Sequence, residues 1–487
     1  MAMAMAAMDT TIVSTAVPQI VGNIGGFSMV GWLFSIYLLT QTVTMPVYGK
    51  LADVYGRRPV LMVGMAIFLV GSALCGSASS MVWLVVFRAV QGLGAGALQA
   101  VVQTVAGDLY SLRERGRIQG LLSSMWAVAA VSGPTLGGVL AEHVNWRWIF
   151  LINLPIGIAA LCLIGRFLRE APRPPRTGDI DVLGSVFILA TCGALVLGLG
   201  QGGTAWAWLS VPSIVCFALV PLLAGATVLV ERRAAEPVIP GWVWRSPVLA
   251  GAGLTYVTLG LLVIGPSAYL PTYAQTSLGL DAVTAGFVLA SMSVGWPVAS
   301  ALSSRLYLRI GFRDTALIGA CVALLAAGGF VLLVHAAPVW IAVASTIVLG
   351  GGLGLISTSL VVGVQSTVAH DQRGVATASL MSSRFLGQSL GAAVFGAVVN
   401  GTLQHRLDDA PAALDGALPS SVDAVATAVL SGEATGAGLA YLRSAIDAST
   451  VQLYLGLTAA AAVAVVVLMC TPRRFPVEEV AGRAEGD

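Results

Sequence analysis

The stretch that decides the fold is Gly49-Lys50-Leu51-Ala52-Asp53-Val54-Tyr55-Gly56-Arg57-Arg58-Pro59. It concentrates charge and glycine between two apolar runs, each long enough to cross a lipid bilayer. Because the cytoplasmic loops of membrane proteins carry an excess of Lys and Arg, we expect this turn to lie at the cytoplasmic face. The stretch therefore predicts two membrane-spanning helices joined by a short basic hairpin.

The composition points to a membrane protein as a whole. Hydrophobic residues make up 57% of the 487 residues and charged residues only 10%, and the mean hydropathy is +0.88. Soluble proteins usually carry about 25% charged residues. Apolar segments of about 20 residues recur along the chain, without the alternating pattern of outer-membrane strands. We therefore predict an all-α, multi-pass protein of the inner (plasma) membrane.

Several functional classes are excluded at this stage. The net charge of +2 and the scattered basic residues give no nucleic-acid-binding patch. The six cysteines form no CxxC pair and fall in or beside apolar runs, so we interpret them as packing residues, and no metal site is expected. The four histidines are scattered among loops, which argues against an enzyme. No GxxxxGK[ST] loop is present, so we expect no cofactor and a proton gradient as the energy source.

The hydrophobic pattern predicts fourteen spans. Alternate loops carry most of the Lys and Arg residues, which predicts that both termini are cytoplasmic and that the number of spans is even. The spans are expected at 1–21, 29–49, 59–79, 82–105, 117–140, 147–167, 181–201, 209–230, 247–270, 283–304, 315–335, 338–363, 375–400 and 451–471.

This pattern divides into two six-helix halves. Aligning Gly311 with Gly56 places Arg313 opposite Arg58 but Leu308 opposite Asp53, which suggests a duplication that has lost its acidic member. The expected domains are an N-terminal bundle at 1–167, a linker at 168–246 with two additional spans, a C-terminal bundle at 247–471 with a long outer loop at 401–450, and a cytoplasmic tail at 472–487.

Further motifs recur in a fixed order along the chain. They are Asp9-Thr10-Thr11-Ile12-Val13, Arg88-Ala89-Val90-Gln91-Gly92-Leu93-Gly94-Ala95-Gly96, Gly133-Pro134-Thr135-Leu136-Gly137-Gly138, Trp146-Arg147-Trp148-Ile149-Phe150 and Arg373-Gly374-Val375-Ala376-Thr377. With residues 49–59, this set resembles the major facilitator superfamily, and within it the fourteen-helix branch of drug:proton antiporters. One departure is Ala129, where the pattern of that branch has glycine.

Asp9 and Arg88 are the candidate proton-coupling residues. Asp9 is the one carboxylate predicted well inside a span, where an unpaired ionisable group costs at least about 2.5–3.5 kcal/mol. We therefore expect it to face a central cavity with Arg88 as its partner, so that it exchanges a proton for substrate while Arg88 tunes that exchange. A purely structural ion pair between the first and fourth helices is the alternative.

The resemblance implies two mechanical elements. The first is a cytoplasmic latch of Gly49, Asp53, Gly56, Arg57 and Arg58, in which Asp53 meets the helix that begins near Gly374, Val375 and Ala376. Arg57 and Arg58 are expected to add ion pairs across the seam or to serve only as topology anchors. The second is a hinge in the fifth helix, consisting of Gly133, Pro134, Gly137 and Gly138.

The substrate is the vaguest part of the prediction. Candidate cavity residues are Tyr37, Gln91, Trp126, Asn153, Tyr256, Tyr273, Trp296 and Gln365. With one acidic residue expected inside, lipophilic cations or neutral amphiphiles fit better than polyanions. The function implied is proton-coupled export of lipophilic drugs or amphiphilic compounds, with a lipid or cell-envelope precursor translocase as the alternative. The expected partners are membrane lipids and a small amphiphilic substrate, and the chain is expected to act as a monomer.

Two terminal features complete the expectations. Only eight residues precede Asp9, about 12 Å of helix against a core of about 30 Å, so we expect a hydrophilic leader before residue 1. In the outer loop at 401–450, short amphipathic helices are predicted at 421–430 and 437–448, acting either as a cap over the exit or as a tether.

Overall fold

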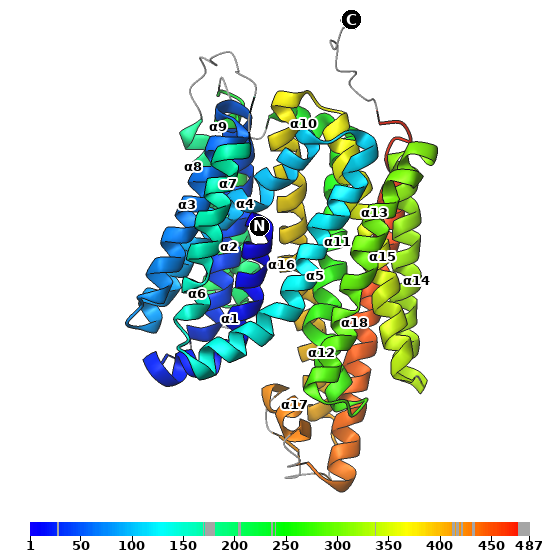
Figure 1. Ribbon diagram of the computed structural model, residues 1–487. Coiled ribbons are helices and arrows are strands. Elements are labelled where there is room, and N and C mark those ends of the chain that lie inside the picture. Colours follow the sequence, from blue (N-terminus) through cyan, green and yellow to red (C-terminus); the bar gives the residue numbers. More distant parts are fainter. Residues whose placement is uncertain are drawn as a thin grey trace, which may run out of the picture.

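The computed structural model describes residues 1–26, 29–168, 170, 181–202, 206–234, 237–238, 240–336, 338–411, 414, 418–419, 422–430 and 434–475. Two helical bundles stand side by side (Figure 1). The N-terminal bundle contains α1 (Ala2–Ile24), α2 (Val30–Tyr55), α3 (Arg57–Gly76), α4 (Met81–Leu109), α5 (Leu112–His143), α6 (Trp148–Leu151) and α7 (Asn153–Phe167). The C-terminal bundle contains α11 (Pro247–Thr276), α12 (Ala282–Ala290), α13 (Met292–Ile310), α14 (Phe312–Ala336), α15 (Val339–Ser366), α16 (Arg373–Asp408) and α18 (Gly436–Cys470).

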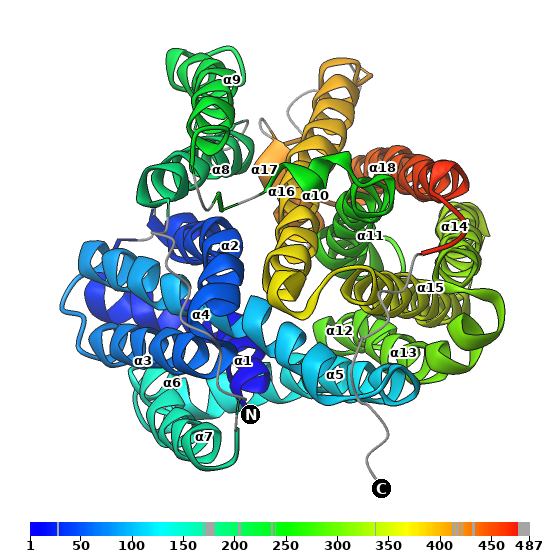
Figure 2. The same ribbon diagram turned by 90° about the horizontal axis from the view of Figure 1, so that it is seen from above.

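A separate helical pair lies at one side of the two bundles. It consists of α8 (Val182–Gln201) and α9 (Val211–Glu231), which pack on each other, and α8 also contacts α2 and α16 (Figure 2). The short helix α10 (Gly241–Arg245) leads into α11. This pair therefore sits where the two bundles meet, beside one helix from each.

Among the described residues, ten helices are long and apolar enough to cross a membrane, including α3, α4, α9, α11 and α18. They make this a multi-pass membrane protein, while the count of fourteen spans and the cytoplasmic position of the termini stay predictions.

Two spans contain a break that the hydrophobic pattern did not indicate. The spans expected at 147–167 and 283–304 correspond to the candidate spans Trp148–Phe167 and Val283–Ile310, which turn at Ile152 between α6 and α7 and at Ser291 between α12 and α13. The outer segment also differs from the prediction. A helix expected at 421–430 is present as α17 (Val422–Leu430), but the one expected at 437–448 is continuous with α18, which has 35 residues. The packing of its buried side chains continues through that stretch and prolongs the helix.

The two junctions aligned in the sequence have the same geometry. Gly56 ends α2 with φ 101° and ψ 155°, and Gly311 ends α13 with φ 91° and ψ 166°. Glycine adopts a positive φ without the steric cost that a Cβ would add. Each glycine thus turns the chain from one long helix directly into the next, at equivalent positions in the two bundles.

The arginine two residues after each glycine also has an equivalent contact. An Arg58 Nη donates to the carbonyl oxygen of Gly165 at 2.5 Å, in the last turns of α7. Arg313 donates from Nε to the carbonyl of Leu468 at 2.9 Å and from Nη2 to that of Met469 at 3.2 Å, in the last turn of α18. Terminal carbonyls lack partners within their own helix, so a cation there satisfies them and opposes the helix dipole. Among the described residues, Arg58 therefore binds within its own bundle and forms no ion pair across the seam.

We expect Arg58→Ala and Arg313→Ala each to lower the free energy of unfolding by about 1 kcal/mol, because each removes the donor that ties down the final helix of its bundle. Thermal unfolding of the purified protein in detergent measures this effect. Arg309→Ala is the matched control, since Arg309 is exposed at the end of α13. Equal stability of the control and the two variants would contradict the assigned role.

Candidate functional site

The basic turn at residues 49–59 lies at one end of the two bundles, where Asp53 near the end of α2 contacts the start of α16. We call this end the latch end. The Asp53 carboxylate accepts hydrogen bonds from the backbone N–H of Gly374 at 2.9 Å and of Val375 at 2.8 Å. Free N–H groups and the helix dipole at the start of a helix favour an anion. A carboxylate of the N-terminal bundle therefore caps a helix of the C-terminal bundle, at the residues named in the sequence analysis.

The cap depends on the close approach of two glycines. A Cβ built on Gly374 would lie 2.4 Å from the carbonyl oxygen of Gly49 and 2.6 Å from the Asp53 carboxylate. A Cβ on Gly49 would in turn lie 2.7 Å from the carbonyl oxygen of Gly374. Any side chain at either position would separate α2 from α16 and lengthen the hydrogen bonds to Asp53.

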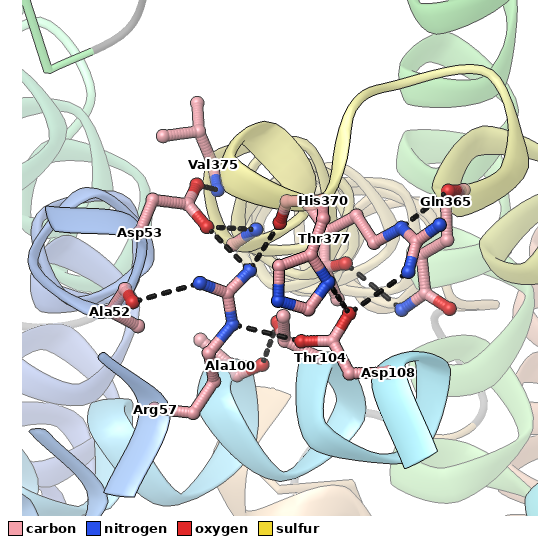
Figure 3. Close-up of polar contacts among 12 residues, drawn as sticks. Ala52, Asp53, Arg57, Ala100, Thr104, Asp108, Gln365, His370, Val375 and Thr377 are labelled. Atoms are coloured by element: carbon pink, nitrogen blue, oxygen red, sulfur yellow. Dashed lines mark hydrogen bonds and ion pairs between the residues drawn. The ribbon is translucent and has the colours of Figure 1, made fainter. Parts of the chain in front are cut away.

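Arg57 extends this contact into a network (Figure 3). Its guanidinium lies 2.8 Å from the Asp53 carboxylate, 2.9 Å from the Asp108 carboxylate and 2.6 Å from the carbonyl oxygen of His370, to which it donates across the seam. Asp108, at the end of α4, in turn contacts His370 Nδ1 and Arg373 Nη1, both at 3.1 Å. Two acids and two arginines from both bundles thus neutralise one another in a largely buried site.

Asp108 was missed by the sequence analysis. The available signal was its position, since a carboxylate directly after the predicted span at 82–105 falls at the same end as Asp53. Gln365, expected in the cavity, instead lies at the latch, where its amide donates to the carbonyl oxygen of Gln103 at 3.1 Å and to Thr377 Oγ1 at 3.0 Å. On the other side of the seam the Tyr307 hydroxyl of α13 donates to the carbonyl of Leu112 in α5. Both seams between the bundles are therefore closed by polar contacts at this end.

We expect Asp53→Asn to loosen the latch end, because it keeps the size of the side chain but removes the charge that Arg57 and the start of α16 favour. The equilibrium between closed and open forms should shift toward opening by roughly tenfold, the scale of one charge-assisted hydrogen bond. Because both seams close the same end, distances between spin labels at the exposed positions Arg113 in α5 and Arg309 in α13, across the neighbouring seam, report this opening.

Asp314→Asn is the matched control for that measurement. Asp314 forms ion pairs with Arg313 at 3.5 Å and Arg473 at 3.0 Å, within the C-terminal bundle alone. The same label distances in Asp53→Asn as in the parent, or the same change in both variants, would show that Asp53 does not hold the seam.

A second polar cluster surrounds Asp9 inside the N-terminal bundle. Asp9 is completely buried, with one carboxylate oxygen 2.5 Å from Arg88 Nη1 and the other accepting from the amides of Gln91 at 2.8 Å and Asn153 at 3.1 Å. The same two amides also reach Ser72 Oγ. The sequence analysis brought Asp9 and Arg88 together for the reason that holds here, since an intramembrane charge needs a partner.

Arg88 has several partners within its own bundle. Nη1 contacts Asp9 and Gln91 Oε1, Nε donates to the carbonyl oxygen of Leu33 at 3.4 Å, and the guanidinium carbon lies 4.1 Å above the ring of Tyr37. This placement corrects part of the prediction. Within the described part of the chain, neither Asp9 nor Arg88 lines the cavity between the bundles, and Tyr37, Gln91 and Asn153 surround Asp9 instead of the cavity.

The glycine cluster of α5 holds α1 in place. A Cβ built on Gly133 would lie 2.0 Å from Thr11 Oγ1, and the same hydroxyl donates to the carbonyl of Ala129 at 3.0 Å. Helix α5 is continuous from Leu112 to His143 and includes Pro134, Gly137 and Gly138. The close approach of α1 and α5 thus positions the helix that carries Asp9, while bending at this cluster stays a prediction.

A cavity of about 480 Å³ lies between the two bundles. Trp126, Tyr256 and Trp296 line it, as expected, whereas Tyr273 is buried in the core of the C-terminal bundle. Five glutamines contribute to the lining: Gln41, Gln99, Gln103, Gln119 and Gln388. Of the described residues that line it, Arg384 is the one charged side chain. This volume and mixed lining suit a small organic ligand.

Comparison with known proteins agrees with this architecture. The family model described as Major Facilitator Superfamily matches residues 1–392. The chain is 34% identical over 413 residues to the multidrug transporter protein MdtP of Bacillus subtilis, covering 84% of this chain and 75% of MdtP. It is 32% identical over 420 residues to multidrug resistance protein 3 of the same organism, covering 85% and 81% of the two chains.

Solved structures share the fold at low sequence identity. The human organic anion transporter MFSD10 (TETRAN) has a TM-score of 0.61 and 14% identity, covering 94% of this chain and 97% of that one. The proton:xylose symporter XylE has a TM-score of 0.58 and 13% identity, covering 93% and 92%. At such identities the likeness concerns the arrangement of helices alone.

Proposed function

The chain belongs to the Major Facilitator Superfamily, with multidrug transporters and efflux pumps among its relatives, and we propose that it exports amphiphilic compounds from the cell in exchange for protons. It is a transporter and not an enzyme. Membership of the family does not by itself assign the direction of transport, the coupling ion or the plasma membrane as the location, and these are part of the proposal. The proposal also takes the chain to act as a monomer with fourteen spans and cytoplasmic termini.

The observation that carries the proposal is the Asp53 cap on α16, which joins the two bundles that enclose the cavity. We assign the latch end to the cytoplasm because Lys50, Arg57, Arg58 and Arg113 gather there. On this assignment the latch must release to admit cargo from the cytoplasm and re-form to release it outside. Separating the paired charges of a buried network is costly while they stay out of water. When the seam opens, water hydrates the separated charges, and this hydration offsets the cost of separating them.

Asp9 is the proposed proton carrier. In the closed-latch form its carboxylate is shut away from solvent and fully bonded. Protonation would release Arg88 and Gln91 from Asp9 and loosen α1 against α4. A structural ion pair is the competing role for the same two residues.

A side pocket favours the second candidate, a lipid or cell-envelope precursor translocase. This pocket of about 210 Å³ lies between α2, α8 and α16, and it shares Leu38, Phe385 and Gln388 with the central cavity. Its position at the outer edge of the bundles offers an apolar route for a molecule that arrives within the bilayer. A translocase would use the same cavity and latch for a lipid cargo.

We expect Asp9→Asn to abolish the increase in dye efflux that a pH gradient drives in everted vesicles, because the amide cannot carry a proton. Exchange of dye down its own gradient, measured without a pH difference, should persist. Asp281→Asn is the control, since Asp281 is an exposed cap of α12. Gradient-driven efflux that is undiminished in Asp9→Asn would refute the coupling role, and loss of both forms of transport would favour a structural pair.

A further inference from the structure

The central cavity contains a cation that has no counter-charge among the described residues of the lining. Arg384, on α16, lines the cavity, and its guanidinium carbon lies 5.2 Å from the ring centre of Trp296 and 5.8 Å from that of Phe385. Its Nε is buried and has no hydrogen-bond partner among the described residues. The described lining includes neither Asp nor Glu. The two aromatic rings hold the guanidinium in place but supply no acceptor for its N–H groups.

Arg88 can be compared with Arg384 because both are arginines inside the same molecule. Both arginines lie within the bundles, yet Arg88 has a carboxylate, an amide oxygen and a backbone carbonyl as acceptors. A guanidinium presents five N–H donors and stays charged, and leaving even one of these donors buried without an acceptor is unfavourable. The cost is removed when a bound molecule brings an anion. Arg384 is therefore arranged for a partner that the protein itself does not provide.

The surroundings of Arg384 describe the rest of that partner. Gln388 follows one helical turn later and also lines the cavity, so its amide can bind the same head group. The Tyr256 hydroxyl already donates to the carbonyl oxygen of Ser357 at 2.7 Å, so its remaining capacity is as an acceptor. Phe385 and Gln388 also line the adjoining side pocket, whose lining is mainly apolar and includes Leu39, Val196 and Ala392. The charged head group and the apolar body of an amphiphile thus have adjoining binding sites.

We propose that the cavity selects amphiphiles with a single anionic group, such as a carboxylate, a sulfonate or a phosphate diester, and that Arg384 is the residue that determines this specificity. The head group pairs with the guanidinium, and the apolar body extends toward the side pocket beneath α8. This inference rests on the proposed transport function, and it replaces the cationic cargo expected from the sequence, because the acid on which that expectation depended lies outside the cavity.

Binding to the purified full chain in nanodiscs tests the proposal without a proton gradient. The anionic probe is 1-anilinonaphthalene-8-sulfonate and the cationic probe is ethidium, each corrected for empty nanodiscs. Arg384→Gln should weaken binding of the sulfonate by about tenfold or more, the loss expected for one charge-assisted ion pair. Arg384→Lys should retain most of the affinity, and ethidium should bind no more weakly to Arg384→Gln than to the parent. Arg309→Gln is the matched control for removal of one exposed arginine.

Three results would overturn the inference. They are sulfonate binding that does not change in Arg384→Gln, equal weakening of both probes with no recovery in Arg384→Lys, and a comparable loss in Arg309→Gln. Competition identifies the source of the anion: displacement of the sulfonate by lysophosphatidylglycerol assigns a lipid head group, displacement by naphthoate alone assigns a soluble organic acid, and displacement by neither contradicts the proposal.

The failure of this inference can be told apart from the failure of the transport proposal. Sulfonate binding that depends on Arg384, without any exchange of the dye across proteoliposomes, would refute transport and leave the binding site intact. Exchange of ethidium that depends on Asp9 and the pH gradient, together with sulfonate binding independent of Arg384, would refute the anion site alone.

Discussion

The contact on which the rest depends is that between the Asp53 carboxylate and the first backbone N–H groups of α16. It joins the two bundles at one end, with groups that also find partners in water, while α2 and α5 also pack directly against α16 and α13 of the other bundle. A purely apolar seam would gain stability in proportion to the area buried, and would resist opening equally at every point. A charged cap instead concentrates the attraction in a few directional bonds. Such a contact specifies one closed arrangement while its net stability stays modest.

The duplicated bundles share geometry but differ in chemistry. The positive φ of Gly56 and Gly311 and the carbonyl contacts of Arg58 and Arg313 recur in both, because each solves the same problem of turning the chain and closing the last helix. The polar residues do not recur. Leu308 stands where the first bundle has Asp53, and Tyr307 closes its seam with a neutral hydrogen bond. The scaffold was therefore retained in both halves, whereas charged contacts became specialised in one.

The sequence could predict those features whose signal lies in neighbouring residues or in a single residue type. The helix-joining turn and the pairing of Asp9 with Arg88 were predictable, because a basic hairpin is contiguous and a charge inside a span demands a partner. The direction in which each helix faces was not predictable. Spans such as α11 and α15 are apolar on every side, so no polar stripe indicates which face meets the cavity. Tyr37, Gln91 and Asn153 were assigned to the cavity although they surround Asp9, and Arg384 was not among the cavity candidates.

The two intramembrane arginines have different surroundings and therefore different roles in the two bundles. Arg88 has its acceptors within its own bundle, so a change at Asp9 is felt first by α1 and α4. Arg384 is unsaturated and stands on α16, the same helix whose first residues Asp53 caps. Occupation of Arg384 by an anion and release of the Asp53 cap thus act on one continuous helix. A rigid helix loaded at its middle and held at its end is a direct mechanical link between cargo and latch, and it requires no chain of intervening side chains.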